Sequence, residues 1–273
     1  MKKSFKKIKD SRKIKAFIII TVLVVGAGIF WYLRTNPVMP QLTIYFLNDV
    51  KLPERGQIVL VFSPHPDDET IACGGYIIES AQRGAEVKIV LVTDGDKHGL
   101  KDLRHSEFKT ATGILGVPDD NLIFLNYPDG KLIQQNQIEL EQVLQNQIDI
   151  HQPDIILYPH PYDIHKDHMI IGNIMEKILE QSSNEKIAYK YLIHHNLYPH
   201  PKKYSPDLYL LMPIKLITFN GGWERLMLSE ETKNLKQKAL RAYKSQLKNT
   251  LLKRLIESFI RENELFALEN YSD

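Results

Sequence analysis

The residue types best suited to chemistry gather in one short stretch, Ser63-Pro64-His65-Pro66-Asp67-Asp68-Glu69. His65 and Asp68 stand three positions apart, so one imidazole nitrogen and one carboxylate oxygen could reach the same cation, and this donor pair suits zinc. Asp67 would then remain free beside the metal to take a proton from a bound water. An acidic residue at a helix start is also a common cap, and for a generic His-x-x-Asp pattern that structural role is the commoner one.

A second cluster raises the weight of the first: His160-Pro161-Tyr162-Asp163-Ile164-His165-Lys166-Asp167-His168. His168 would supply a third ligand, and three protein ligands with one open position are the pattern of a catalytic zinc site. Zinc lowers the pKa of bound water to about 7, so Asp67 could draw off its proton at neutral pH. His165 could protonate a leaving amine, and Asp167 could orient a histidine. Iron (Fe²⁺) would fit the same donors.

The other polar candidates are weaker. Asp94 lies in Thr93-Asp94-Gly95, where Asp-Gly is first of all a turn signal. Arg104 opens a predicted helix with Glu107 three positions on, which is the spacing of a local pair, but it would also suit a grip on a hydroxylated substrate. The remaining histidines are interpreted as loop, surface or packing residues: His98, His105, His151, His160, His194, His195 and His200.

The two clusters must lie at strand ends for their chemistry to converge. Apolar runs predict strands at 58–62, 87–93, 122–125, 154–158, 187–194 and within 208–219, and helices at 70–83, 102–115, 135–151 and 167–179. Such alternation is typical of an α/β fold: a Rossmann-like, doubly wound, mostly parallel sheet with helices on both faces. In the strand order 3-2-1-4-5, the first and fourth strands are neighbours, so both clusters would face each other at one sheet edge. Charged helices are expected over 229–247 and 251–268, and residues 42–50 are ambiguous between strand and short helix.

The amino-terminal end predicts a membrane anchor. Residues 1–15 carry eight basic side chains and one acidic one, and residues 16–33 follow without a charge. At about 1.5 Å per residue this run approaches the ~30 Å hydrocarbon core, and Trp31 and Tyr32 stand at its far end as interfacial aromatics. A cleaved signal peptide is the competing interpretation, but the run exceeds the usual ~7–15 apolar residues and no convincing cleavage site follows. The positive-inside rule places residues 1–15 in the cytoplasm and the catalytic part outside.

The chain is therefore divided into a basic tail (1–15), a transmembrane anchor (16–33), a linker (34–56) and one domain (57–273). Because the whole chain carries +2 and the tail +7, the rest carries −5, which argues against a nucleic-acid partner. Cys73 is the single cysteine, so an intrachain disulfide is excluded and the domain relies on its core. Oligomeric state does not follow from the sequence.

With these residues laid out, the chain resembles the PIG-L/LmbE-like family of zinc-dependent N-acetylglucosamine deacetylases over residues 57–268. The resemblance is carried by the first cluster, Thr93-Asp94-Gly95, the run 104–117, His165-Lys166-Asp167-His168, and the segment 238–246. It implies zinc on His65, Asp68 and His168, Asp67 as general base, His165 supported by Asp167 at the tetrahedral intermediate or the amine, and sugar contacts from Arg104 and Asp94. Some members carry a Tyr where this chain has Asp163, two residues before the first His of the last motif, so the oxyanion donor is left open.

The resulting hypothesis is a membrane-anchored zinc amidase that removes acetyl from an N-acetylglucosamine-containing glycolipid or envelope glycan on the outer face of a bacterial membrane. One alternative is another metal hydrolase that cleaves a larger amide or a phosphoester, although phosphoesterases often need two metals and the sequence supplies ligands for one. A second is an anchored glycan-binding protein with an idle site. A nucleotide-binding Rossmann protein is disfavoured, because the first strand-to-helix turn lacks Gly-x-Gly-x-x-Gly.

Overall fold

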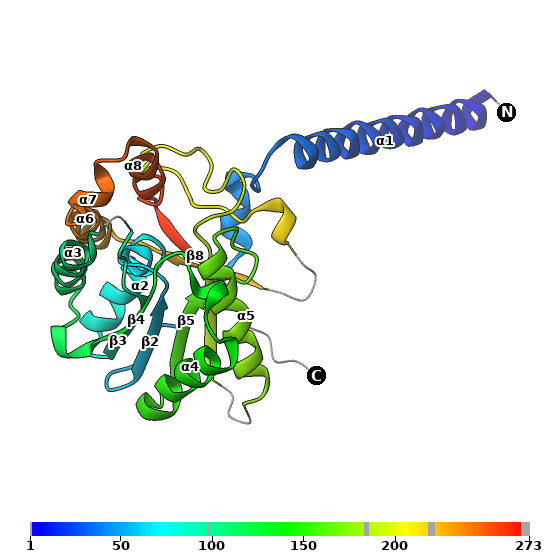
Figure 1. Ribbon diagram of the computed structural model, residues 1–273. Coiled ribbons are helices and arrows are strands. Elements are labelled where there is room, and N and C mark those ends of the chain that lie inside the picture. Colours follow the sequence, from blue (N-terminus) through cyan, green and yellow to red (C-terminus); the bar gives the residue numbers. More distant parts are fainter. Residues whose placement is uncertain (1, 98, 183–185, 218–221, 269–273) are drawn as a thin grey trace.

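The computed structural model describes residues 2–97, 99–182, 186–217 and 222–268, with side chains from residue 13 onward (Figure 1). Within these residues, eight strands form one sheet in the order β1-β7-β8-β6-β5-β2-β3-β4. The strands are β1 (Asn48–Asp49), β2 (Ile58–Ser63), β3 (Glu86–Thr93), β4 (Leu122–Tyr127), β5 (Ile155–Pro159), β6 (Ile187–Tyr191), β7 (Trp223–Met227) and β8 (Asn263–Leu268).

The five strands from β4 to β6 pair in parallel in the order β4-β3-β2-β5-β6, which is the predicted order 3-2-1-4-5. Strand β8 runs antiparallel to both of its neighbours, β6 and β7. The predicted α/β fold with a mostly parallel sheet is confirmed. Strands β2 and β5 are hydrogen-bonded neighbours, so the loops that carry the two His/Asp clusters leave the same edge of the sheet.

Helices cover both faces of the sheet because alternate residues of each strand point to opposite sides. In β2, Val59 and Val61 belong to the apolar cluster that α2 (Asp68–Gln82), α3 (Lys101–Ile114), α6 (Glu230–Leu240) and α8 (Thr250–Glu257) complete. Leu60 and Phe62 belong to the cluster on the other face, completed by α4 (Gln137–His151) and α5 (Lys166–Glu180). Burial on both faces explains why these strands are continuous apolar runs.

The carboxyl-terminal part differs from the expectation. Residues 208–217 do not form the predicted sixth strand; they run as a loop with a short 3-10 helix, η4 (Ile214–Leu216), and Phe219 lies outside the described residues, as does His98. The segment 229–247 is divided into α6 and α7 (Lys244–Leu247), and 251–268 is α8 followed by strand β8 rather than one helix. Strand β7 was not predicted.

These differences have a long-range cause. The Asn263 side chain of β8 accepts a hydrogen bond from Leu210 N (2.8 Å) and donates one to Leu210 O (3.2 Å). This pairing satisfies backbone groups that would otherwise need a strand partner. The apolar run at 208–217 is therefore a buried loop, and the polar residues of β8, which suggest a helix by spacing, are interior residues with fixed partners.

The sequence predicts a linker over residues 34–56, but this segment packs on the domain. Val38 forms a β-bridge with Pro213, and Ile44, within the 3-10 helix η1 (Gln41–Phe46), is fully buried. Strand β1 then joins the edge of the sheet beside β7. Both readings of the ambiguous residues 42–50 therefore occur, one after the other.

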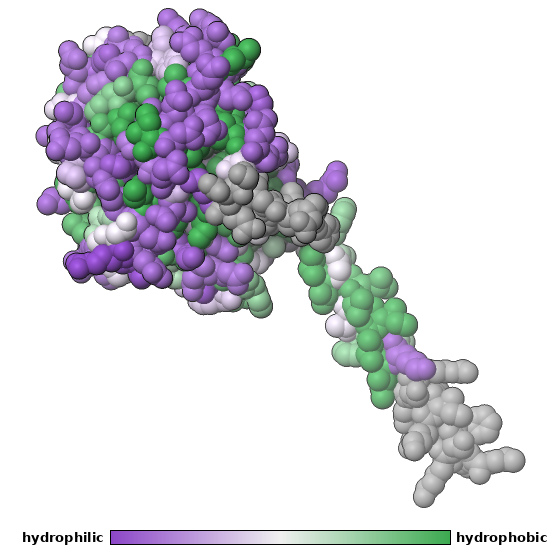
Figure 2. All heavy atoms as spheres, turned by 90° about the horizontal axis from the view of Figure 1, so that it is seen from below, coloured by the Kyte–Doolittle hydropathy of each residue, from purple (hydrophilic) through white to green (hydrophobic). Residues whose placement is uncertain are grey.

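Helix α1 (Lys2–Thr35) extends away from the domain (Figures 1 and 2). Its segment Lys13–Thr35 has 23 residues and is long and apolar enough to cross a membrane. Large apolar side chains such as Leu23 and Trp31 are about two-thirds exposed there (66% and 67%). Figure 2 shows this apolar shaft beside a mostly hydrophilic domain surface.

Candidate metal centre and catalytic pocket

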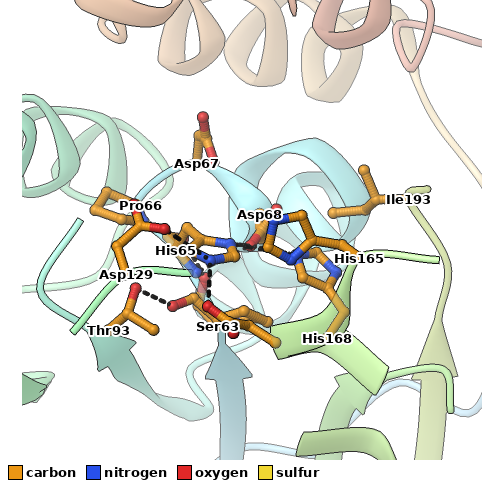
Figure 3. Close-up of polar contacts among 12 residues, drawn as sticks. Ser63, His65, Pro66, Asp67, Asp68, Thr93, Asp129, His165, His168 and Ile193 are labelled. Atoms are coloured by element: carbon orange, nitrogen blue, oxygen red, sulfur yellow. Dashed lines mark hydrogen bonds and ion pairs between the residues drawn. The ribbon is translucent and has the colours of Figure 1, made fainter. Parts of the chain in front are cut away.

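Three ligand-type atoms from the two clusters meet where β2 and β5 end. Asp68 Oδ2 lies 3.0 Å from His65 Nδ1 and 3.0 Å from His168 Nε2, and the two nitrogens are 3.3 Å apart. In a tetrahedral zinc site with bonds of ~2.0 Å, two ligand atoms are about 3.3 Å apart. The three atoms are thus spaced as ligands of one metal ion, and Figure 3 shows the side chains converging.

The charge of this cluster also favours a cation. Burial lowers the pKa of His65, but hydrogen bonds to Asp167 and Asp68 outweigh that effect and raise the pKa to about 9. Burial acts in the same way on His168, and the charges of Asp68 and Asp163 raise its pKa well above the usual value. The carboxylates thus impose a need for positive charge on the site, which a divalent metal ion would meet.

The ring nitrogens that face away from the cluster lie beside carboxylates. His65 Nε2 is 3.2 Å from Asp167 Oδ2 and 3.4 Å from Asp129 Oδ1. His168 Nδ1 is 3.2 Å from Asp163 Oδ2, without hydrogen-bond geometry among the described residues. Such outer carboxylates fix the orientation of metal-binding histidines and raise their basicity. Asp167 therefore lies where a residue that orients a histidine would lie.

Asp163 is a site residue whose role the sequence did not show. It is buried, its Oδ1 accepts a hydrogen bond from His165 N (2.8 Å), and its Oδ2 accepts from His194 N (2.9 Å) and Ile193 N (3.2 Å). It therefore ties the loop after β5 to the loop after β6 while facing the His168 ring. An Asp at this position serves to hold backbone and rings rather than to contact a substrate.

Close packing places the start of α5, and with it His165 and His168. Gly172 lies against the turn that follows β5: an added Cβ would be 2.6 Å from Pro159 O and 2.8 Å from Pro161 Cα. Any side chain at this position would push α5 away from the sheet edge. The glycine therefore sets the distance between the second cluster and the first.

Asp67 occupies an unusual backbone conformation at the start of α2. Its φ of 129° lies in a region that non-glycine residues rarely adopt, and such strain clusters at functional sites. Burial raises the pKa of its carboxyl well above the usual value, although the charge of Arg104, 3.8 Å away, opposes the shift. Figure 3 shows Asp67 pointing away from the imidazoles. A buried carboxylate held apart from the ligands is suited to accept a proton.

Glu69 holds the strained turn in place. Its fully buried carboxylate accepts hydrogen bonds from Ser63 Oγ (3.0 Å), Asp67 N (3.3 Å), Thr70 Oγ1 and Tyr243 Oη. Tyr243 belongs to the carboxyl-terminal segment that carries part of the family resemblance. Its contribution here is structural, because it joins that segment to the first cluster.

Arg104 and Asp94, the expected sugar contacts, are largely engaged with the protein. The Arg104 guanidinium donates to Gly95 O (3.1 Å), Pro66 O (3.0 Å) and Asp129 Oδ2 (3.0 Å), while its buried Nε has no partner among the described residues. Asp94 Oδ1 accepts from Asp129 N (3.1 Å). Arg104 lines the pocket, and it also fixes the loop that carries Asp129. It can therefore influence substrate binding by holding Asp129 in position.

Asp129 is a second residue that sequence reasoning missed. The pattern Tyr127-Pro128-Asp129-Gly130 is typical of a turn, yet it stands at the end of β4 and so lies at the same sheet edge as both clusters. Asp129 faces His65 and Arg104, and it lines the pocket. An acidic residue directly after a parallel strand was the available signal.

A cavity of about 340 Å³ opens above the cluster, within the size range of small-molecule sites. Polar groups of the segment 245–249 and apolar side chains of α8 face the cluster across it. Its lining residues are His65, Asp67, Asp68, Ile71, Lys97, Leu100, Arg104, Asp129, His165, His194, Ser245, Gln246, Asn249, Leu252 and Leu255. This mixed wall suits a ligand with both hydroxyl and apolar groups.

Two further imidazoles border the donors. The His165 ring is centred 4.7 Å from that of His65 and 5.0 Å from that of His168, and its buried Nδ1 has no partner among the described residues. The His194 ring, expected at the surface or in packing, is centred 5.0 Å from that of His168 and lines the cavity. Burial and the charge of a neighbouring histidine lower the pKa of both rings to about 4.

Comparison with known proteins agrees with this geometry. Residues 60–179 match the family described as PIG-L, GlcNAc-PI de-N-acetylase. A probable N-acetyl-alpha-D-glucosaminyl L-malate deacetylase 2 from Bacillus anthracis is 27% identical over 134 residues, which cover 44% of this chain and 58% of that relative.

Two solved structures show the fold. N,N'-diacetylchitobiose deacetylase from Pyrococcus horikoshii matches with a TM-score of 0.61 at 21% identity, over 90% of this chain and 93% of that one. A 4-carboxy-2-hydroxymuconate hydratase from Pseudomonas putida matches with a TM-score of 0.51 at 17% identity, over 73% and 82%. The family match includes both His/Asp clusters, and it supports the resemblance of residues 60–179 to PIG-L/LmbE-like deacetylases.

Proposed function

We propose that this protein is a metal-dependent amidase that hydrolyses the acetamide of an N-acetylated amino sugar and releases acetate. The observation that carries the proposal is the convergence of His65 Nδ1, Asp68 Oδ2 and His168 Nε2 within 3.3 Å of one another at the floor of a cavity. The buried carboxylate of Asp67 borders the same cavity. A de-N-acetylase family match over these residues gives the reaction class.

Zinc is the metal that we propose for this site, with Fe²⁺ as the alternative. Two imidazole nitrogens and one carboxylate oxygen are the donor types of catalytic zinc, and three protein ligands leave a position open. A bound metal ion would polarise the acetyl carbonyl and lower the pKa of a water.

The chain's own residues would divide the proton transfers. Asp67 accepts a proton from the attacking water, whose oxygen forms a bond to the acetyl carbon. The C–N bond then breaks, and the proton that Asp67 accepted passes through His165 to the departing nitrogen, so that acetate and a free amino sugar result. Asp167 and Asp163 keep the rings in place throughout, because each lies beside an outer ring nitrogen.

The fold by itself does not select this reaction, because a hydratase shares it. The test is acetate release by the zinc-loaded full-length protein, supplied with N-acetylglucosamine, a vesicle-borne glycolipid that carries it, and envelope oligosaccharides. Asp67→Asn is the matched blank, since it keeps the side-chain volume and loses the base. We expect release from at least one substrate, and at least about a hundredfold slower release by the variant. Equal release by both proteins would overturn the assignment of Asp67, and no release from any substrate would overturn the deacetylase proposal.

We further propose that α1 anchors the protein in a membrane, with residues 1–15 in the cytoplasm and the domain outside. The supporting observations are the 23-residue apolar segment and the basic tail before it. The segment is followed without a free linker, because Met39 N donates to Met212 O (3.0 Å) and Ile214 N donates to Pro37 O (3.1 Å). The domain would thus be held directly at the bilayer surface.

This attachment favours a substrate at the membrane. A second cavity, of about 210 Å³, lies between residues 33–37 at the end of α1 and the loops 195–198 and 214–215. His195 lines it, and the preceding residue, His194, lines the catalytic cavity. A glycolipid or surface glycan would therefore lie close to the catalytic cavity while it stays at the membrane. We expect the full chain to stay with vesicles after carbonate extraction and the domain to be digested by protease added to intact cells stripped of their wall; recovery in the soluble fraction would refute the anchor.

A further inference from the structure

His194 belongs to the catalytic cavity although it lies outside both motif clusters. It follows β6, and one ligand-type atom of its ring lies within 4.8 Å of those of Asp68 and His168. Its ring centre is 5.5 Å from that of His165. It therefore borders the donor atoms on the side that opens to the cavity.

Asp163, which faces the proposed metal ligand His168, also fixes the backbone at His194. His194 N donates to Asp163 Oδ2 (2.9 Å), and His194 O accepts from Ile164 N (2.7 Å). Asp163 Oδ2 is also 3.2 Å from His168 Nδ1. The position of His194 is thus coupled to the position of His168 through one buried carboxylate, which is a form of preorganisation.

The spacing suits a shared oxygen atom. In a tetrahedral metal site an oxygen ligand would lie about 3.3 Å from the ligand atoms of Asp68 and His168, and a hydrogen bond to it spans about 2.8 Å more, so one oxygen can bridge the 4.8 Å to the His194 ring. A neutral imidazole carries one N–H donor, so His194 donates to the pocket when the proton is on the ring nitrogen that faces the pocket. An acyl oxygen placed at the donor triad would lie within reach of that N–H.

We propose that His194 is a further hydrogen-bond donor of this pocket, which binds the acyl carbonyl oxygen and stabilises the oxyanion that forms when water adds to the carbonyl carbon. This inference rests on the proposed amidase function and assigns the oxyanion donor that the sequence leaves open at Asp163. The oxyanion is formed by attack of water and collapses when the C–N bond breaks, and His194 keeps its proton throughout.

The test uses the zinc-loaded full-length protein and His194→Ala, with His200→Ala, an exposed histidine of the same loop, as the matched control. The first readout is the calorimetric affinity for methylphosphonate, a tetrahedral oxyanion that needs no turnover. The second is bound zinc per chain, and the third is kcat and KM for acetate release. Loss of one oxyanion donor lowers kcat by about 10²–10³-fold in other enzymes.

We expect His194→Ala to bind methylphosphonate at least tenfold more weakly, to keep its zinc and to lose kcat with little change in KM. His200→Ala should match the wild type in all three, and His194→Gln, which keeps an N–H donor, should recover part of the affinity. Unchanged methylphosphonate affinity in His194→Ala would overturn the proposal, and so would loss of zinc, which would make His194 a ligand or a structural residue. Methylphosphonate binding tests the role of His194 without an acetamide substrate. A failure of the His194 proposal can therefore be distinguished from a failure of the deacetylase proposal.

Discussion

Two buried polar clusters contact helix α2, and they differ in how completely their groups are paired. At the middle of the helix, Glu264 Oε1 takes hydrogen bonds from Lys236 Nζ (2.6 Å) and Gly75 N (2.6 Å), and Oε2 takes one from Tyr76 N (2.9 Å). The side chains of Lys236 and Glu264 are each 1% exposed. This cluster is closed and its charges balance.

The cluster at the start of α2 is open by comparison. It gathers imidazoles and carboxylates under a cavity, and the buried atoms His165 Nδ1 and Arg104 Nε have no partner among the described residues. Buried polar groups without partners are rare and costly in folded proteins. The comparison teaches that a paired cluster of this kind holds the fold, whereas an incompletely paired one beside a cavity is arranged for a ligand.

The largest effect is expected when a proposed metal ligand is removed from the open cluster. We expect His168→Ala to lose its zinc and to release no acetate above the blank, because two remaining donors do not hold a catalytic zinc. Elemental analysis of the purified chain and an acetate assay measure this. Zinc at full occupancy in the variant would exclude His168 from the ligands.

Removal of the proposed base should separate binding from chemistry. Asp67→Asn is expected to lower kcat by about 10²–10⁴-fold while zinc content stays at the wild-type level, because proton transfer by a positioned group is worth that much. Steady-state kinetics with metal analysis on the same sample provides the measurement. A variant that keeps its kcat would require another base in the pocket.

Substitutions in the closed cluster of Lys236 and Glu264 should lower the stability of the fold rather than the zinc content. Lys236→Met leaves Glu264 buried without its cation, and breaking one side of such a pair costs about 3–5 kcal/mol of unfolding free energy. Thermal and urea unfolding measure the loss, and the double variant Lys236→Met with Glu264→Gln should recover part of it. Zinc content per folded chain should not change. Loss of zinc in the folded single variant would contradict the division between the two clusters.

A smaller effect is expected from the carboxylate that orients His65. Asp167→Asn keeps the shape and one of two acceptors, Oδ2 for Gly130 N or Oδ1 for Leu132 N, and it removes the negative charge beside His65 Nε2. Zinc affinity should fall by about 10–100-fold. Competition with a chromophoric chelator gives the value, and a change below threefold would leave Asp167 with a purely structural role.

The sequence predicted the parallel half of the fold and most of the candidate site for one reason: both depend on local patterns at strand ends. The five parallel strands are apolar runs, and each cluster follows one of them directly. The strand order then predicts that the two clusters lie side by side, because a doubly wound sheet brings the ends of its two central strands together.

The rest depended on contacts between distant residues. Strand β8 carries Asn263 and Glu264 inside the core, where Leu210, Gly75 and Lys236 pair with them, and no local pattern shows such partners. Asp163, in the loop after β5, binds the backbone of His194, in the loop after β6, and no local pattern connects these two loops. Asp129 stands in a turn pattern shortly after β4, and the turn pattern alone gives it no role beside His65 and Arg104.

The central claim is a catalytic metal centre at His65, Asp68 and His168, and anomalous diffraction from crystals of the zinc-loaded full-length protein tests it most directly. Data collected on both sides of the zinc absorption edge would locate the metal without reference to activity. We expect one peak per chain, bonded to His65 Nδ1, Asp68 Oδ2 and His168 Nε2, with Asp67 outside the bonding distance. A peak held by other residues, or none at these atoms in crystals of protein that releases acetate, would contradict it.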